Sequence, residues 1–338
     1  MNPSFVSLLV PLFLLIAAPV QQQPAPAQQP APADKPEQAE APIHVEVNVV
    51  NVFFTVRDKQ GGLVGNLGKD DFTVFEDGKQ QTVRYFTRET DLPFTMGLLI
   101  DVSPSQENLV DIEKDAASQF FGSVLRPKDL AFLISFGGDA DLLQDYTNSP
   151  KLLRAGLNGL HVNASMSGLG PGPVPTIYHP KGTILYDAVY LASHDELHGQ
   201  VGRKALILIT DGEDEGSSYK IQDAIEQAQK ADAIIYSIAY VDRQFYRSHG
   251  AFYGGDSALQ RMSSETGGRV FEVDRKHPLT EVFQEIQAEM RTQYAIGYTP
   301  ANTARDGSYR KIEIRCANKD QKVQARKGYY ATPNSDSE

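Results

Sequence analysis

The chain has 338 residues, of which 41% are hydrophobic and 22% are charged. This length accommodates about two domains of about 150 residues, and the composition is that of a globular protein rather than a disordered or fibrous one. With 32 Lys and Arg against 43 Asp and Glu, the net charge is −11, which argues against nucleic-acid binding because that function needs a basic face. The single cysteine, Cys316, excludes an intrachain disulfide and metal sites built from several cysteines.

The first segment, residues 5–20, is an apolar block followed directly by a Gln-, Pro- and Ala-rich tract. A transmembrane helix needs about 20 residues, and this block is shorter. Its length is that of a signal-peptide core, although no Lys or Arg precedes it. We expect residues 1–27 to be a cleaved signal peptide and 28–42 a disordered linker. The mature protein is then secreted or periplasmic without a membrane span; an uncleaved anchor is the alternative.

The next segment, residues 43–90, is rich in Val, Phe and Thr in alternating order, which predicts β-strands. Within the run 71–86, Asp77-Gly78 predicts the turn of a β-hairpin. We therefore expect this segment to be the first part of a small β module.

Residues 91–291 alternate apolar strand patterns with amphipathic helix patterns, and a Gly- and Pro-rich stretch at 167–175 is expected to be a surface loop. This alternation predicts an α/β domain with a Rossmann-like, doubly wound and mostly parallel sheet that is covered on both faces. The predicted strands are 93–101, 130–136, 205–210 and 233–240, and the predicted helices are 106–124, 182–197, 219–231, 257–265 and 278–291.

Residues 292–331 return to β-rich patterns that resemble the opening segment, and 332–338 are expected to be a disordered tail. Each β-rich flank holds too few strands to bury both of its faces. We predict that the two flanks pair into one β-sandwich-like module, so that the α/β domain is an insertion within it. Two unrelated β extensions, or edge strands added to the central sheet, are the alternatives.

Oxygen-bearing side chains stand where two predicted strands end and where one predicted helix begins. Since the carboxyl ends of parallel strands meet at one edge of an α/β sheet, we expect these side chains to lie together. Hydroxyl and carboxylate oxygens are hard donors, which suit Mg²⁺ or Mn²⁺ better than zinc or copper. The predicted metal ligands are Asp101, Ser103, Ser105, Thr183 and Asp211.

These residues lie in DVSPS (101–105), in Gly182-Thr183 before ILYDA, and in Asp211-Gly212 after an apolar strand. Together they resemble the metal-ion-dependent adhesion site (MIDAS) of the von Willebrand factor A (VWA) domain, with all five positions of its DxSxS…T…D pattern filled in order. The resemblance implies that the two serines coordinate the metal directly. It implies direct or water-mediated coordination by the threonine and the two aspartates.

The resemblance extends over residues 45–331, whose flanks are similar to those of the VWFA-related family of Acidobacteria. This resemblance implies that the chain contains a VWA domain with β-rich flanks and that it is exported from the cytoplasm. Pro104 lies between the two serines and fixes a backbone angle there, which a turn tolerates.

Two other patterns have a functional and a structural interpretation. The acidic run 211–215 is compatible with an additional Ca²⁺ but lacks the spacing of an EF-hand loop, which favours a solvated rim near a helix start. Aromatic residues between 236 and 253 include four in a polar loop after a core strand: Phe245, Tyr246, Phe252 and Tyr253. They predict either a protein-contact surface or a loop packed on its own domain.

We expect the protein to be an exported recognition or adhesion module that binds an acidic group of a protein partner through Mg²⁺. Two alternatives stay open: a secreted metal-dependent hydrolase, and a structural envelope protein whose metal only stabilises the loops. We do not expect an enzyme, because none of the three motifs carries a His or Glu placed as a general base. The chain also lacks the glycine-rich and nucleophile-elbow motifs of NTPases, dehydrogenases and α/β hydrolases.

Overall fold

The computed structural model describes residues 49–89, 92–162, 182–249 and 253–331. All of them belong to the larger of the two units into which the chain divides, Val47–Glu338. The expected signal peptide, linker, C-terminal tail and the loop at 167–175 lie outside the described residues.

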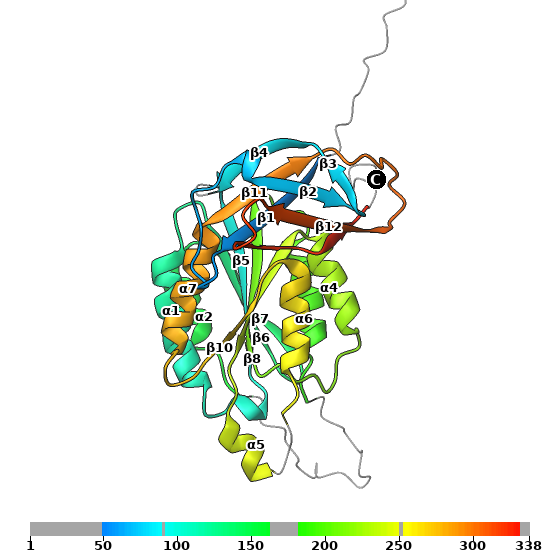
Figure 1. The fold of residues 1–338 in the computed structure, drawn as a ribbon. Coiled ribbons are helices and arrows are strands. Elements are labelled where there is room, and N and C mark those ends of the chain that lie inside the picture. Colours follow the sequence, from blue (N-terminus) through cyan, green and yellow to red (C-terminus); the bar gives the residue numbers. More distant parts are fainter. Residues whose placement is uncertain (1–48, 90–91, 163–181, 250–252, 332–338) are drawn as a thin grey trace, which may run out of the picture. The chain divides into compact units, whose positions relative to one another are not determined.

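A six-stranded sheet forms the centre of the larger unit (Figure 1). Its strand order is β10-β9-β8-β5-β6-β7, and every neighbouring pair is parallel except β6 and β7. The four inner strands are almost entirely buried because helices cover both faces, which confirms the predicted doubly wound α/β architecture. The strands are β5 (Phe94–Asp101), β6 (Leu130–Phe136), β7 (Ala140–Thr147), β8 (Arg203–Thr210), β9 (Ala233–Ala239) and β10 (Val270–Glu272).

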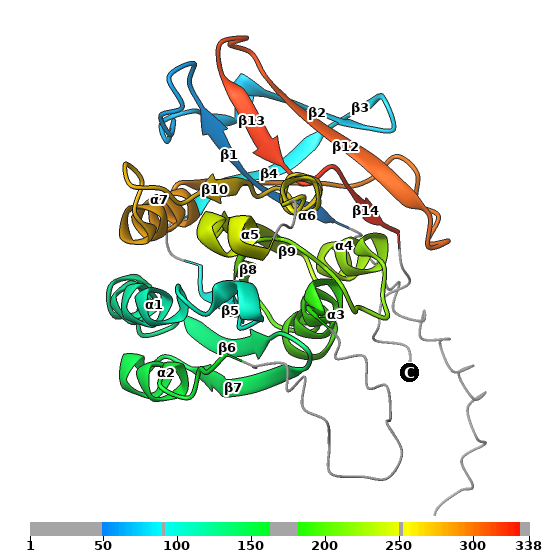
Figure 2. The ribbon, with the colours of Figure 1, turned by 90° about the horizontal axis from the view of Figure 1, so that it is seen from below.

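Helices pack on the two faces of the sheet and create two apolar cores (Figure 2). One core joins the sheet to α1, α2 and α7, and in it Phe120 stacks on Phe283 with ring centroids 4.4 Å apart. The other joins the opposite face to α3, α4 and α6. The helices are α1 (Val110–Val124), α2 (Pro150–Leu157), α3 (Leu185–Leu191), α4 (Ile221–Lys230), α5 (Arg243–His249), α6 (Asp256–Thr266) and α7 (Leu279–Arg291).

The two β-rich flanks form two four-stranded sheets, ordered β13-β1-β11-β4 and β14-β12-β2-β3. Each sheet contains strands from both flanks, and a shared apolar core lies between them. This confirms the prediction of one β-sandwich-like module. Its strands are β1 (Val50–Arg57), β2 (Phe72–Glu76), β3 (Lys79–Gln81), β4 (Val83–Glu89), β11 (Gln293–Tyr298), β12 (Tyr309–Cys316), β13 (Lys322–Ala325) and β14 (Gly328–Tyr330).

The predicted hairpin turn is present, but the strand that follows it divides between the two sheets. Asp77 and Gly78 both have positive φ, 47° and 78°, as a tight two-residue hairpin turn requires. The run after the turn was expected to be one strand to residue 86. Instead β3 pairs with β2 while β4 pairs with β11, because the chain crosses from one sheet to the other at Thr82.

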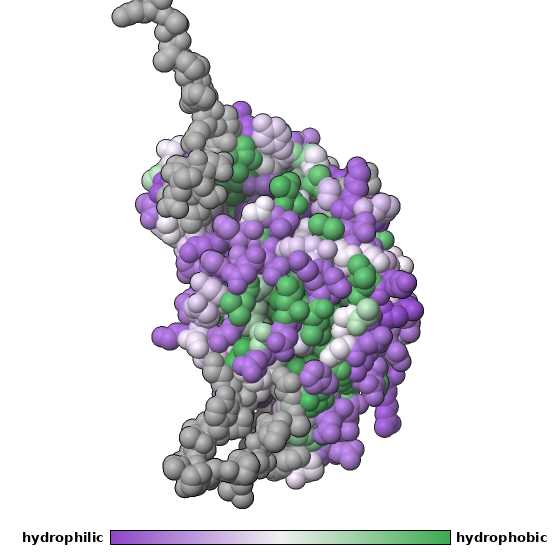
Figure 3. Space-filling model, turned by 180° about the vertical axis from the view of Figure 1, so that it is seen from behind, coloured by the Kyte–Doolittle hydropathy of each residue, from purple (hydrophilic) through white to green (hydrophobic). Residues whose placement is uncertain are grey.

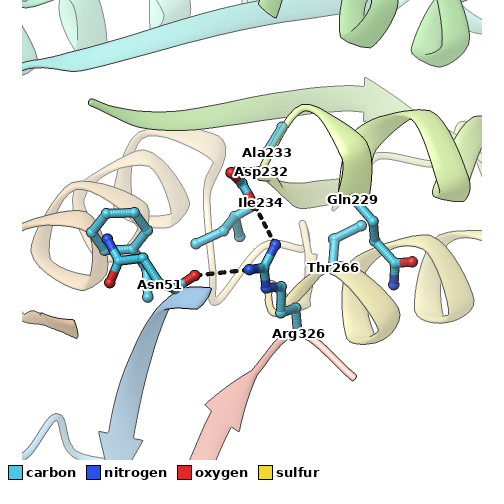
Figure 4. A pocket seen from close by; sticks show the side chains of 8 residues that line it. Asn51, Gln229, Asp232, Ala233, Ile234, Thr266 and Arg326 are labelled. Carbon is cyan, nitrogen blue, oxygen red and sulfur yellow. Dashed lines mark hydrogen bonds and ion pairs between the residues drawn. The ribbon is translucent and has the colours of Figure 1, made fainter. Parts of the chain in front are cut away.

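Arg326, the residue that follows β13, contributes to the contact between the module and the α/β domain (Figure 4). Its guanidinium group forms an ion pair with Asp232, at the start of β9, and donates to the backbone carbonyl of Asn51 at 2.8 Å. Only 12% of the Arg326 side chain is exposed, but 54% of the Asp232 side chain is, so this pair is partly open to solvent.

A second polar contact surrounds Glu289, a fully buried residue of α7. Its carboxylate accepts hydrogen bonds from Arg57 at 2.7 Å, Arg269 at 3.0 Å and Gln324 at 2.8 Å. The chain runs from α7 directly into β11. The module therefore lies at the amino ends of the parallel strands, and the carboxyl ends and α5 lie at the opposite end (Figure 1).

Several local predictions differ from the structure. The helix expected at 106–124 begins at Val110, because Pro104 and the turn that follows form a short 3₁₀ helix, η2 (Pro104–Gln106). The helix expected at 182–197 is α3 followed by a π-helical segment, Ala192–Leu197. Two strands and two α-helices of the described residues were not predicted, namely β7, β10, α2 and α5. Of these, α5 corrects the expectation that the aromatic stretch after β9 is entirely a loop.

Strand β7 is the antiparallel edge strand of the central sheet and lies on the face shown in Figure 3. It is only partly buried, and 47% of Leu142 is exposed, so its apolar side chains reach the surface. Within the part of the chain that the structure describes, no helix has the length and apolar character needed to span a membrane.

Candidate metal centre

The predicted ligands lie at the carboxyl edge of the central sheet. Asp101 is the last residue of β5, and Ser103 and Ser105 follow it in the turn that becomes η2. Asp211 comes directly after β8, which pairs in parallel with β5. Parallel pairing puts the ends of these two strands side by side, so the two aspartates enter the same site.

Direct contacts bring Ser103, Ser105 and Asp211 together. The hydroxyl oxygens of the two serines are 3.1 Å apart, and Ser105 donates to Asp211 Oδ2 at 2.6 Å. Gln106 donates its side-chain amide to the same carboxylate oxygen at 3.1 Å. Ser103 and Asp211 are almost fully buried, and the three oxygen donors form one compact group.

Asp101 is fully buried beside this group and is oriented by its neighbours. Its Oδ1 accepts the backbone N–H of Ser103 at 2.9 Å, and its Oδ2 accepts the hydroxyl of Thr210 at 2.6 Å. Burial and the nearby charge of Asp211 raise the pKa of Asp101 well above its usual range, in spite of these two hydrogen bonds. The environment thus disfavours the ionised form unless a positive charge is present.

Thr183 is buried and its loop is tied to the same edge of the sheet. Its carbonyl oxygen accepts the N–H of Glu215 at 2.9 Å, four residues after Asp211. A Cβ at the preceding residue, Gly182, would lie 2.5 Å from the Glu215 carboxylate, so a glycine permits this close approach. No described hydrogen bond joins the Thr183 side chain to the other four predicted ligands.

Three buried carboxylates lie at this edge without a cationic partner. Among the described residues, no Lys, Arg or His forms an ion pair with Asp101, Asp211 or Glu113. Glu113, on α1, is fully buried and neither of its carboxylate oxygens has a hydrogen-bond partner. Burial and the charges of Asp101 and Asp211 raise its pKa well above the ordinary value. A divalent cation would compensate this charge.

The donors suit a hard cation. In the described part of the chain, no group of three or more His, Cys, Asp and Glu side chains is arranged to hold a metal. A cation at this edge must therefore use the serine hydroxyls together with the two aspartates. Hydroxyl and carboxylate oxygens are the donors that Mg²⁺ and Mn²⁺ accept, so the residues present fit such an ion.

The acidic residues after Asp211 support the surrounding loops. Asp214 accepts the N–H of Tyr186 at 3.1 Å and the hydroxyl of Ser217 at 2.6 Å, and Glu213 accepts the N–H of Gly254. Asp214 thus bonds to the first turn of α3, where a negative charge is favourable. These contacts show that the acidic run helps to hold the loops at this edge.

Four residues of the site were not predicted: Thr210, Gln106, Glu113 and Tyr246. The first two are sequence neighbours of predicted ligands, and this proximity was the available signal. Tyr246, on α5, donates its hydroxyl to Asp211 Oδ2 at 2.7 Å. It was noted only as one of several aromatic residues, because no sequence pattern indicates a contact between positions 35 residues apart.

No protein-family model and no curated protein matches this chain. Among solved structures, it is similar to the conserved hypothetical protein BatB from Bacteroides thetaiotaomicron, with a TM-score of 0.43 and 18% identity over 58% of this chain and 97% of that chain. An aerotolerance-related membrane protein from Bacteroides fragilis gives a TM-score of 0.42 and 17% identity over 58% and 98%.

A third similar structure is proximal thread matrix protein 1 from the mussel byssus, solved with a zinc-occupied MIDAS motif. It gives a TM-score of 0.46 and 13% identity over 64% of this chain and 50% of that chain. The resemblance to VWA domains is carried by the motif residues and the fold described above. The resemblance to the Acidobacteria family stays a prediction from the sequence.

Proposed function

We propose that this protein binds a divalent cation, Mg²⁺ or Mn²⁺, and through it recognises an acidic side chain of a protein partner. The observation that carries this proposal is the pair of buried aspartates, Asp101 and Asp211, beside two serine hydroxyls and without a cationic partner among the described residues. The bound cation supplies positive charge and a coordination position for a carboxylate oxygen. The proposed ligands are Asp101, Ser103, Ser105, Thr183 and Asp211.

Neighbouring residues prepare these ligands. Thr210 fixes the Asp101 carboxylate by its hydroxyl, and Gln106 does the same for Asp211 by its amide. Held in this way, the oxygen donors need little rearrangement to bind a cation, which reduces the entropic cost of binding. The β module lies at the opposite end of the sheet and does not cover this edge (Figure 1).

We favour recognition over hydrolysis because of the groups that contact the ligand set. In the described part of the chain these are the side chains of Thr210, Gln106 and Tyr246, none of which is a general base at neutral pH. Glu113 is enclosed in the protein, out of reach of a substrate. We therefore propose a binding protein rather than an enzyme, with a purely structural metal as the second candidate.

A peptide-display selection tests the proposal directly. Random peptides are selected on the protein with Mg²⁺ and eluted with a chelator. We expect the eluted peptides to share an Asp or Glu, and replacement of that residue by Asn or Gln to abolish binding. The Asp101→Ala variant should retain none of these peptides. Asp223→Asn, at a half-buried acid in the first turn of α4 that accepts the N–H of Lys220, should retain all of them.

Two outcomes contradict the proposal. Peptides that bind equally well in chelator show that the metal does not mediate recognition. A protein that melts at much lower temperature in chelator, while no acidic peptide is selected with Mg²⁺, supports the structural role of the metal instead.

We also propose that the protein is exported and that its signal peptide is cleaved before Asp34. The apolar block at 5–20 and the polar tract after it support this. Mass spectrometry of the protein from its native cell should find an N-terminus between about Gln21 and Gln28. An intact Met1 on a cytoplasmic protein contradicts it.

A further inference from the structure

The hydroxyl group of Tyr246 contacts the proposed metal ligands, although Tyr246 belongs to none of the three predicted motifs. Its hydroxyl donates to Asp211 Oδ2 at 2.7 Å and lies within hydrogen-bonding reach of Ser105. The tyrosine belongs to α5, which follows β9 at the carboxyl edge of the sheet. It is therefore the described side chain that reaches the ligands from the exposed side of that edge.

The oxygen atoms are spaced like neighbouring ligands of one cation. In an octahedron with metal–oxygen distances of about 2.0–2.1 Å, adjacent ligand oxygens lie about 3 Å apart. The two serine hydroxyls are 3.1 Å apart, and Asp211 Oδ2 lies 2.6 Å from Ser105. The hydroxyl oxygen of Tyr246 lies at a similar distance, 2.7 Å, from Asp211 Oδ2. It thus stands where a further ligand, such as a partner's carboxylate, would bind.

The bond from Tyr246 is not needed to satisfy Asp211. Asp211 Oδ2 already accepts the Ser105 hydroxyl and the Gln106 amide, and Oδ1 accepts the N–H of Glu213. The start of α5 is fixed independently, because Asp242 accepts a hydrogen bond from Asn108 at 2.7 Å. The phenol can therefore leave while the carboxylate and the helix stay in place.

A cavity beside the site provides room for the displaced ring. It has a volume of about 650 Å³, and Tyr246 itself forms part of its wall. Carboxylates that could accept the phenol line the same cavity, among them Glu272 and Asp274. Tyr253 already makes such a bond within it, to Asp256. A hydroxyl that leaves Asp211 thus has alternative acceptors nearby.

We propose that Tyr246 is an internal competitor for the partner's carboxylate. In the partner-free protein its hydroxyl holds the ligand position beside Asp211, and an acidic partner displaces it into the neighbouring cavity. This inference rests on the proposed function, since it requires a cation at the site. Its consequence is that Tyr246 lowers the affinity for weak carboxylate ligands and so increases selectivity for partners with additional contacts.

The test uses Mn²⁺ as the cation and acetate as the carboxylate. Bound Mn²⁺ broadens the methyl NMR signal of any acetate that enters its coordination shell, so the broadening measures acetate binding. Tyr246→Phe removes only the hydroxyl, and we expect it to bind acetate about threefold to tenfold more tightly, which corresponds to one hydrogen bond. Tyr219→Phe, an exposed tyrosine stacked on Tyr190, is the control and should match the wild type.

The outcomes separate the two proposals. If Tyr246→Phe binds Mn²⁺ as the wild type does but shows equal or weaker acetate binding, Tyr246 is not a competitor, while the metal site stands. If the wild type binds no Mn²⁺, the metal site fails and the competitor role fails with it. Unchanged Mn²⁺ stoichiometry with tighter acetate binding in Tyr246→Phe supports both.

Discussion

Buried acidic side chains occur at both ends of the α/β domain, but among the described residues only one end supplies them with cationic side chains. Near the β module, Glu289 is fully buried and bonded to the guanidinium groups of Arg57 and Arg269. At the opposite edge, Asp101 and Asp211 are equally buried, yet their partners among the described residues are hydroxyls, amides and backbone N–H groups.

This difference separates a charge that is paired within the protein from charges for which we propose a function. A buried carboxylate that is paired within the chain stabilises a contact between elements, whereas an uncompensated one costs free energy in the folded state. A protein that retains two or three uncompensated acids at one edge gives up stability there. This cost is consistent with the cation and the partner that we propose to bind at that edge.

The largest expected effect lies in the module. Tyr294 packs on Phe54, Phe72 and Phe86 with ring centroids 5.4 to 5.8 Å apart, and its hydroxyl donates to the Val64 carbonyl. Tyr294→Ala should lower the free energy of unfolding by about 3–5 kcal/mol in chemical denaturation. Metal binding by the folded variant should be unchanged, because the module lies at the opposite end of the sheet from the carboxyl edge that carries the proposed metal ligands, here called the metal edge. A shift in metal affinity would contradict this separation.

A smaller loss is expected from Glu289→Gln, which keeps the shape of the side chain and removes its charge. Arg57 and Arg269 then lose an anionic partner, so stability should fall by about 2 kcal/mol. Denaturation with and without Mg²⁺ measures the effect, which should be the same in both conditions. A stabilised variant would show that Glu289 is as poorly compensated as the acids of the metal edge.

A substitution of the same kind at the metal edge should increase stability rather than reduce it. Asp101→Asn removes the repulsion with Asp211, so in chelator at about pH 8 we expect a gain of about 1 kcal/mol. The wild type should be stabilised by added Mg²⁺ and the variant should not. If Asp101→Asn is destabilised in chelator, other groups of the chain already compensate the negative charge of Asp101 and Asp211.

The sequence was sufficient to predict the arrangement of the fold and to predict that Asp101 and Asp211 lie at one edge of the central sheet. Continuous apolar runs such as 93–101 indicated strands buried on both faces, and Asp101 and Asp211 at strand ends indicated the edge where ligands meet. The pairing of the two flanks followed from the need of each to bury an apolar face. These features depend on local patterns, which a single sequence displays.

What the sequence did not reveal depends on contacts between distant residues. The division of residues 79–89 between two sheets requires partners in β2 and β11, which the run itself does not specify. Edge strand β7 alternates poorly because both of its faces are partly exposed. The contact of Tyr246 with Asp211 exists only because α5 folds over the edge of the sheet.

Calorimetric titration of the metal-free protein with Mg²⁺ or Mn²⁺ tests the central claim most directly. We predict one site per chain in the wild type, no site in Asp101→Ala, and an unchanged site in Asp223→Asn. Equal binding by the wild type and Asp101→Ala would show that the cation binds elsewhere and would contradict the account.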